Sequence, residues 1–305
     1  MFEHILVPLD GSDLAESALP AAAYLADALD ARATLIHVIE EDAPQEIHGQ
    51  RHLSDPGEAQ DYLAETAEGA FPLGASVDWH VHSAKVRDVA QSIAGHVDEL
   101  GPDLIVMCTH GSGGVRGWLL GSIAQQVIGL KKAPVLLVQP VVAGAAPPFE
   151  CRRMLVPLDG HPQHEQGLAL AAGLVEPCQA EMRLLCVVPT RGTLKSERAA
   201  SARLLPGASI ALLEFDQEAA SAYLERLVEE LEGQGLWAAT EVRRGDAASV
   251  IVQAARDSES DVIVLGTHGK AGMEAFWSES VAAQVCNQAE LPLLLVPVES
   301  PTGEA

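Results

Sequence analysis

Basic residues are scarce in this chain of 305 residues. Lysine and arginine together number 19, against 43 aspartates and glutamates, so the formal net charge is −24 and the pI is near 4.7. A surface this acidic repels an extended phosphate backbone. We therefore expect neither nucleic acid nor an anionic membrane surface as a partner.

Long apolar runs and paired cysteines are also missing. No uncharged apolar stretch reaches the roughly 18 residues that a spanning helix needs, and the first residues are acidic where an export signal would be basic. The five cysteines are scattered and none belongs to a CxxC pair, so no disulfide framework is predicted. Hydrophobic residues still make up 48% of the chain, enough for sizeable cores. We expect a folded protein of the reducing cytoplasm.

The most informative feature is an internal repeat. Three phrases of the first half recur in the same order in the second half: ILVPLDG at 5–11 and MLVPLDG at 154–160, DLIVMCTHG at 103–111 and DVIVLGTHG at 261–269, APVLLVQP at 133–140 and LPLLLVP at 291–297. This indicates a tandem duplication. An Ala/Gly/Pro-rich stretch predicts a linker at 143–150 between domains at 1–142 and 151–305.

Each half alternates short β-branched or leucine-rich runs with longer helical stretches, which predicts βαβ units around a buried parallel sheet. The expected strands lie near 4–9, 33–39, 76–82, 103–108 and 134–138, and near 153–158, 181–188, 237–243, 261–266 and 292–296. One helix is predicted from Ser12, which can cap it, to about Leu29. The least regular segments, 40–56 and 189–214, are predicted to be loops.

A glycine-rich turn follows the fourth expected strand of the first half. It runs from Gly111 to Gly121, where an amphipathic stretch begins. Glycines let the backbone approach a ligand closely, and the free amides of a helix start favour an anion. The chain has no GxxxxGK(S/T) loop, and no dinucleotide fingerprint follows its first strand. The turn therefore predicts a phosphate site of another kind.

Several residues together resemble a known family. Asp10 follows a Val-Pro-Leu strand, a Thr-His-Gly turn ends at Gly111, a nine-residue spacer leads to Gly121 and Ser122, and a Pro-Val-Leu-Leu-Val strand closes the half. This combination is similar to the universal stress protein family, whose ATP-binding members carry G-x2-G-x9-G-(S/T). The resemblance covers both halves.

The resemblance implies, for each half, a five-stranded parallel sheet in the order 3-2-1-4-5 between layers of helices, with ATP as the cofactor, alone or with Mg²⁺. The residues implied at the nucleotide are Pro8, Leu9, Asp10 and Val38 at adenine and ribose, and Met107, Cys108, His110, Gly111, Gly121, Ser122 and Ile123 around ribose and phosphates. It also implies that the closing strands pack the two halves together as a pseudo-dimer within one chain. Two chains could then form a homodimer.

The two halves depart from the family pattern in different ways. The first half begins the motif with Cys108 instead of glycine, which we expect to weaken binding without abolishing it. The second half keeps Gly266 and Gly269 but has Glu279 before Ser280. A carboxylate about 4 Å from a phosphate charge costs roughly 4 kcal/mol at an effective dielectric constant of 20. We therefore predict that the first half binds the nucleotide and that the second is degenerate.

This interpretation favours a regulatory, nucleotide-binding protein of the stress response with an unidentified protein partner. No nucleophile has an evident base beside it, so no catalytic residue is predicted and any ATP hydrolysis should be weak. Two alternatives stay open: a slow ATPase or nucleotidyl-transferring enzyme, and a nucleotide-free interaction scaffold. His80 and His82, like His161 and His164, are only pairs in the sequence, so no metal site is predicted.

Overall fold

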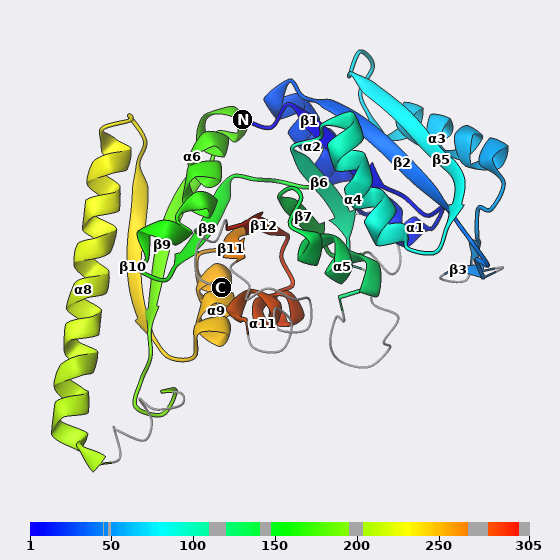
Figure 1. The fold of residues 1–305 in the computed structure, drawn as a ribbon. Coiled ribbons are helices and arrows are strands. Elements are labelled where there is room, and N and C mark those ends of the chain that lie inside the picture. Colours follow the sequence, from blue (N-terminus) through cyan, green and yellow to red (C-terminus); the bar gives the residue numbers. More distant parts are fainter. Residues whose placement is uncertain are drawn as a thin grey trace.

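Ten strands form one continuous sheet in the computed structural model (Figure 1). The structure describes residues 1–44, 46–47, 50–109, 120–140, 148–194, 204–267 and 280–298. In spatial order the strands are β10 (Ala238–Arg244), β9 (Glu181–Val188), β8 (Arg153–Leu158), β11 (Val262–Thr267), β12 (Leu293–Pro297), β7 (Val135–Val138), β6 (Leu104–Cys108), β1 (His4–Pro8), β2 (Arg32–Glu40) and β5 (Val77–Val86). Neighbouring strands are parallel except β12 and β7. The mainly parallel α/β fold predicted from the sequence is confirmed.

The strand order places the same two strands side by side in each half. Counted along the chain, the five strands of each half lie in the order third, second, first, fourth, fifth. The first and fourth strands of the first half are β1 and β6, which pair in parallel. Parallel sheets of this kind bind ligands beyond the carboxyl ends of the strands, at the point where the connections change direction. Each half therefore has one place, beyond the carboxyl ends of its first and fourth strands, where a ligand site is expected.

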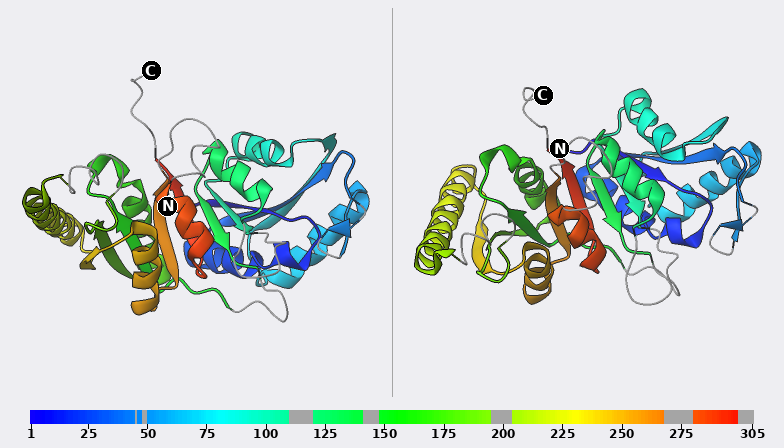
Figure 2. Two further views of the ribbon diagram at one scale, coloured as in Figure 1. Left: turned by 90° about the horizontal axis from the view of Figure 1, so that it is seen from below. Right: turned by 60° about the horizontal axis from the view of Figure 1, so that its bottom comes forward.

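Helices cover both faces of the sheet (Figures 1 and 2). One face carries α1 (Asp13–Glu16), α2 (Leu19–Leu29), α3 (Pro56–Ala70), α6 (Gln166–Cys178) and α8 (Pro206–Glu232), and the other carries α4 (Val89–Leu100), α5 (Ser122–Leu130), α9 (Ala247–Asp257) and α11 (Val281–Gln288). Each face has one hydrophobic core, and each core contains residues of both halves. A short 3₁₀ turn, η1 (Pro162–His164), and a hairpin of β3 (Glu46–Ile47) and β4 (Gln50–Arg51) complete the described elements.

The two closing strands join the halves. β7 and β12 run antiparallel, with Leu136 opposite Leu294 and Leu137 opposite Leu293. The first pair belongs to the core on one face and the second pair to the core on the other. Both strands are apolar and buried, so their pairing removes two edges that would otherwise face water. The packing of the halves through their closing strands is thus observed, whereas association of two chains stays a prediction.

The helix predicted from Ser12 to about Leu29 is interrupted. Ser12 does cap the first piece, because its Oγ accepts a hydrogen bond from the amide of Ala15 at 3.2 Å. That piece, α1, ends at Glu16, and α2 begins at Leu19. Pro20 has no amide hydrogen to donate to the preceding turn, which favours an interruption at this point.

The prediction of a loop over 189–214 is wrong in its last part. Helix α8 begins at Pro206, a residue that suits a first helical turn because it needs no donor there. The helix is held by Leu213, Leu224, Leu227 and Leu231, which are buried. The other segment predicted as a loop contains the β3–β4 hairpin, and α3 begins at its end. Most of the linker expected at 143–150 lies outside the described residues, and the domain boundaries stay predictions.

Replacement of Leu136 by alanine tests the junction between the halves. Because Leu136 is 2% exposed and faces Leu294, Leu136→Ala should lower the free energy of unfolding by about 2–5 kcal/mol. Urea denaturation followed by circular dichroism measures this loss. Leu73→Ala is the control, since Leu73 is fully exposed and should change stability by less than about 0.5 kcal/mol. Equal effects of the two substitutions would contradict the role of the junction.

Candidate functional site

A cavity of about 330 Å³ opens at the carboxyl ends of β1, β2 and β6. Its walls are mainly apolar and contain a few polar side chains, a composition typical of small-molecule sites. The residues that line it are Pro8, Leu9, Asp10, Ala15, Ile36, His37, Val38, Glu40, Ile47, His52, Val89, Ile93, Met107, Gly121, Ser122, Ile123 and Ala124. The cavity therefore lies where the strand order predicts a ligand site in the first half, beyond the ends of β1 and β6.

Eight of the eleven residues that the family resemblance implies line this cavity: Pro8, Leu9, Asp10, Val38, Met107, Gly121, Ser122 and Ile123. His110 and Gly111 lie outside the described residues. Cys108 is not among the lining residues and is 1% exposed. Burial, and secondarily the charge of Asp10, raise the pKa of its thiol to about 12, so the thiol is unreactive at neutral pH.

The turn after β1 holds Asp10 in a defined orientation. The amide of Ser12 donates to Oδ1 of Asp10 at 3.0 Å, and the hydroxyl of Ser12 donates to the same oxygen at 2.6 Å. Between them Gly11 has a φ of +87°, which side chains disfavour. The side chain of Leu53 covers this glycine so closely that an added Cβ would stand 2.8 Å from Leu53 Cδ1. The turn therefore accepts only glycine without strain.

His37 connects three segments beneath the cavity. Its Nδ1 lies 2.9 Å from the carbonyl oxygen of Leu9, and its Nε2 lies 2.9 Å from that of Leu53. His37 is 1% exposed and stands between apolar residues, Ile36 and Val38, of strand β2. It thus ties the segment after β4 to the end of β1. The sequence did contain a signal for this role, because His37 is the one polar residue in the apolar run 35–39.

His52 is the second cavity residue that sequence reasoning missed. Its side chain is 6% exposed, and neither ring nitrogen has a hydrogen-bond partner among the described residues. The ring stands edge-on to that of His37, with centroids 6.4 Å apart. Buried polar atoms normally have partners. Since His52 lines the cavity, its ring is a candidate contact for a bound molecule.

Helix α5 begins at the wall of the cavity. Its cap residue, Gly121, has extended backbone angles and no side chain to accept hydrogen bonds from the first-turn amides. Those amides carry the positive end of the helix dipole. Together with Ser122, they form the part of the wall best suited to an anion.

The second half has a smaller counterpart of about 220 Å³, lined among others by Asp159, His164 and Ser280. Its polar groups are used internally. Asp159 accepts from the amide of His161 at 3.0 Å through Oδ1, and its Oδ2 lies 2.6 Å from Nδ1 of His164. Ser280 accepts from the amide of Ala283 at 3.1 Å and so caps α11. Glu279, on which the sequence analysis based its prediction of degeneracy, lies outside the described residues.

The fold and its two crevices define a class of protein. Its members have tandem doubly wound α/β domains, each with a crevice at the carboxyl ends of its first and fourth strands. The model of the universal stress protein family matches residues 1–139 and 150–297. The chain belongs to the universal stress protein family, as its sequence motifs predicted. None of the helices in the described part of the chain is both long enough and apolar enough to cross a membrane.

Individual relatives agree with a duplicated chain. Universal stress protein YxiE of Bacillus subtilis is 29% identical over 151 residues, which are 46% of this chain and 100% of that protein. Universal stress protein MJ0531 of Methanocaldococcus jannaschii is 30% identical over 145 residues, 48% of this chain and 81% of that protein. Each of these alignments therefore accounts for about half of this chain.

Two solved structures match nearly the whole chain in fold. A universal stress protein from Archaeoglobus fulgidus has a TM-score of 0.63 at 18% identity, and the match covers 97% of this chain and 98% of that one. A protein of unknown function from Pseudomonas aeruginosa has a TM-score of 0.68 at 17% identity, covering 97% and 93%. At these identities the likeness concerns the fold.

Alanine substitutions at the two equivalent turn glycines separate backbone strain from crowding. Gly11 and Gly160 both have a positive φ, but a Cβ on Gly160 would meet no atom within 4 Å. We expect Gly160→Ala to cost about 1 kcal/mol of stability and Gly11→Ala to cost about 1–3 kcal/mol more, because Leu53 must move. Chemical denaturation measures both values. Equal losses would show that Leu53 does not close over the turn.

Proposed function

We propose that the first half binds an adenine nucleotide, ATP in the first instance, and that the protein acts as a ligand-dependent regulatory protein in a stress response. The observation that carries this proposal is the cavity beyond β1 and β6, which combines apolar walls, an oriented carboxylate and a helix N-terminus without a side-chain cap. Membership of the universal stress protein family supports the same function.

Each part of a nucleotide finds matching chemistry in this cavity. Pro8, Val38 and Met107 offer apolar contact to a flat base. Asp10, held by Ser12, is a natural acceptor for a ribose hydroxyl. The first-turn amides of α5 are suited to the phosphates. All three groups belong to one cavity.

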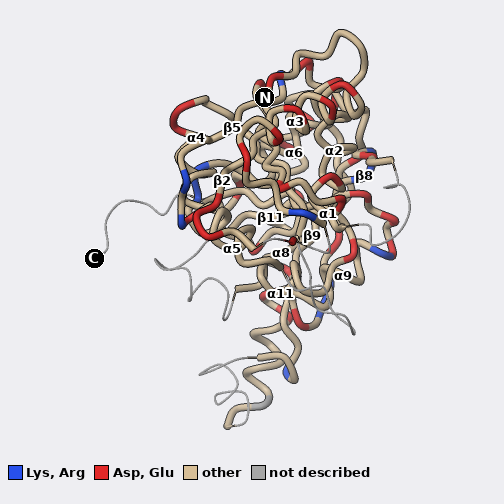
Figure 3. The backbone as a smooth tube through the Cα atoms, turned by 90° about the vertical axis from the view of Figure 1, so that its right-hand side faces the viewer, with Lys and Arg blue, Asp and Glu red and all other residues tan. Residues whose placement is uncertain are grey.

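The charge of the cavity bears on the need for Mg²⁺. Acidic residues are distributed along the described chain and basic ones are sparse, as the colours of the backbone show (Figure 3). Asp10 and Glu40 line the cavity, and no lysine or arginine is among the lining residues that the structure describes. Phosphates there would be opposed by two carboxylates, and among the described residues the first-turn amides of α5 and Ser122 are the donors suited to them. We therefore expect Mg²⁺ to strengthen binding by reducing the charge of the triphosphate.

The second half is proposed to bind a nucleotide weakly or not at all. Its aspartate is already hydrogen bonded to His164, and the first turn of its α11 helix is capped by Ser280. A ligand would have to replace these internal hydrogen bonds before gaining its own. We therefore expect one bound nucleotide per chain.

Matched aspartate substitutions test the nucleotide site and the asymmetry together. In the full chain, Asp10→Asn should weaken binding of Mg²⁺-ATP about 10–100-fold, because it removes a charged acceptor worth roughly 1.5–3 kcal/mol. Asp159→Asn, the equivalent change in the second half, should leave affinity and stoichiometry unchanged. Isothermal titration calorimetry provides both values.

Several results would contradict the proposal. A wild-type chain without measurable affinity for ATP, ADP or cyclic nucleotides would favour the scaffold interpretation. Loss of binding in Asp159→Asn with retention in Asp10→Asn would transfer the site to the second half. Multiple-turnover hydrolysis that is abolished by Asp10→Asn would favour the enzyme interpretation.

His52 yields a prediction in which affinity and stability change in opposite directions. Replacing it with phenylalanine keeps a ring of similar size and removes two buried nitrogens that lack hydrogen-bond partners among the described residues. His52→Phe should therefore leave stability unchanged or raise it by about 1 kcal/mol, while affinity for the nucleotide falls about 3–10-fold. Thermal unfolding and calorimetry measure the two effects. Unchanged affinity would show that His52 does not contact the ligand.

A further inference from the structure

Three histidines from two elements meet beside the outer strand of the sheet. His80 and His82 lie two residues apart on β5, so they share one face, and His96 comes from α4. The ring of His96 lies 5.0 Å from that of His80 and 5.1 Å from that of His82, measured between centroids. One nitrogen from each ring lies within 4.8 Å of the other two. The sequence showed only a pair here, and the fold supplies the third imidazole.

The hydrogen bonding of His96 prepares it to be a ligand. Its Nδ1 lies 2.7 Å from the carbonyl oxygen of Ser92, and a carbonyl can only accept, so Nδ1 carries the proton. Nε2 is then left with its lone pair. The side chain is 2% exposed, and Nε2 has no hydrogen-bond partner among the described residues. Metal-bound histidines are commonly oriented in this way by a carbonyl on the opposite nitrogen.

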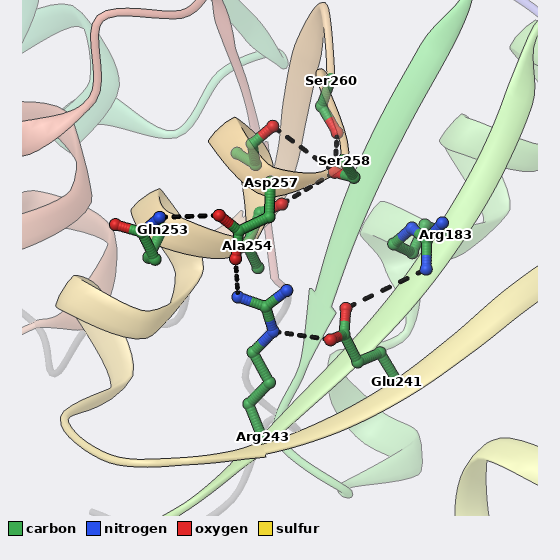
Figure 4. Close-up of polar contacts among 9 residues, drawn as sticks. Arg183, Glu241, Arg243, Gln253, Ala254, Asp257, Ser258 and Ser260 are labelled. Carbon is green, nitrogen blue, oxygen red and sulfur yellow. Dashed lines mark hydrogen bonds and ion pairs between the residues drawn. The ribbon is translucent and has the colours of Figure 1, made fainter.

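The second half fills the equivalent place with an ion-pair network (Figure 4). Arg243 on β10 donates to Glu241 at 2.7 Å and to Asp257 of α9 at 2.6 Å, and Gln253 donates to Asp257 at 2.7 Å. These bonds tie the outer strand of the second half to the helix that follows it. The tie is thus made by oppositely charged side chains in direct contact.

The strand registers establish that the two places are equivalent. His80 pairs with Ile36, which pairs with Pro8 of the repeated phrase. Glu241 pairs with Leu185, which pairs with the second copy of that proline, Pro157. His80 therefore occupies the place of Glu241. The same pairing continues two residues along each strand, so His82 occupies the place of Arg243.

The helices correspond in the same way. Asp88 caps α4 and Asp246 caps α9, each by accepting from an amide of the first turn. Counted from these caps, Glu99 stands where Asp257 stands, and His96 stands where Ala254 stands. The first half thus has a carboxylate, Glu99, at the same place on its helix, but a histidine stands where the second half has its arginine. Three imidazoles take the place of the ion pair.

We propose that His80, His82 and His96 bind one divalent transition-metal ion, Zn²⁺ in particular, which ties β5 to α4 in place of the ion pair of the second half. Imidazole nitrogens suit zinc, and three histidines leave a fourth tetrahedral position for water or another oxygen. Glu99 is near enough to supply that oxygen or to balance the charge, since its carboxylate lies 3.7 Å from Nε2 of His96.

Small side-chain rotations complete the geometry. Zinc–nitrogen bonds of about 2.0–2.1 Å in a tetrahedron separate the nitrogens by about 3.4 Å. The present separations are within 4.8 Å, and His80 and His82 are only half-buried, so their rings can turn inward. Their partners on β2, Ile36 and Val38, line the cavity described above. The metal would therefore stabilise the sheet edge beside that cavity.

Zinc titration of the untagged full chain, freed of metal with a chelator, tests the proposal. Calorimetry should detect one Zn²⁺ at this site, and zinc should raise the unfolding temperature. The double variant His80→Ala, His82→Ala removes two direct ligands and should lower the zinc affinity at least about 100-fold. Loss of a residue that only orients a metal ligand already costs roughly 10–100-fold. Co²⁺ should give the intense visible absorption of a tetrahedral site in the wild type and lose it in the double variant. Because both substituted rings are half-buried, the variant is expected to fold, which circular dichroism verifies.

His164→Ala is the matched control. His164 belongs, with Asp159 and His161, to the other group of three ligand-type side chains in the described chain. The variant should keep the zinc affinity, the temperature shift and the Co²⁺ spectrum of this site. The proposal is overturned if the wild type binds no zinc, if the double variant binds it unchanged, or if only His164→Ala loses it. Failure of the nucleotide experiment would not affect these results, since Asp10→Asn leaves all three histidines in place.

Discussion

The antiparallel pairing of β7 with β12 is the interaction on which the rest of the structure depends. Each half ends in a short apolar strand that would be an exposed edge if the half stood alone. Pairing them produces one ten-stranded sheet with a single core on each face. The two halves are therefore held in a fixed relation, with their crevices beyond the carboxyl ends of separate parallel strands.

Within this shared framework the two halves differ at polar positions that border the crevices. The first half leaves the amides of α5 without a side-chain cap, whereas Ser280 caps the equivalent helix of the second half. The aspartate after the first strand is held by a serine in one half and by a histidine in the other. Substitutions of this kind change which groups a ligand can reach without altering the apolar pattern that forms the sheet. Under the proposed function, the first half would bind the nucleotide and the second would serve the structure.

The acidity of the chain limits how it can recognise a phosphate. With a net charge of −24, long-range attraction of an anion is not available. Recognition must come from short-range donors in a shielded place, and backbone amides at a helix start are such donors. Amides add no side chain that could attract other polyanions. The proposed nucleotide site would therefore need no basic patch of the kind that binds nucleic acid.

The sequence by itself determined the duplication, the family and the parallel α/β class, because these follow from repeated phrases, from motifs and from the periodicity of apolar residues. Its resemblance to the family also implied eight of the seventeen residues that line the cavity. It did not reveal the environments of His37, His52 and His96, which are set by contacts between segments distant in the chain. The break between α1 and α2 and the start of α8 had local signals, Pro20 and Pro206, which the sequence predictions left unused. A pattern of residues specifies which side chains are buried, but only the packed structure decides which buried polar atoms meet one another.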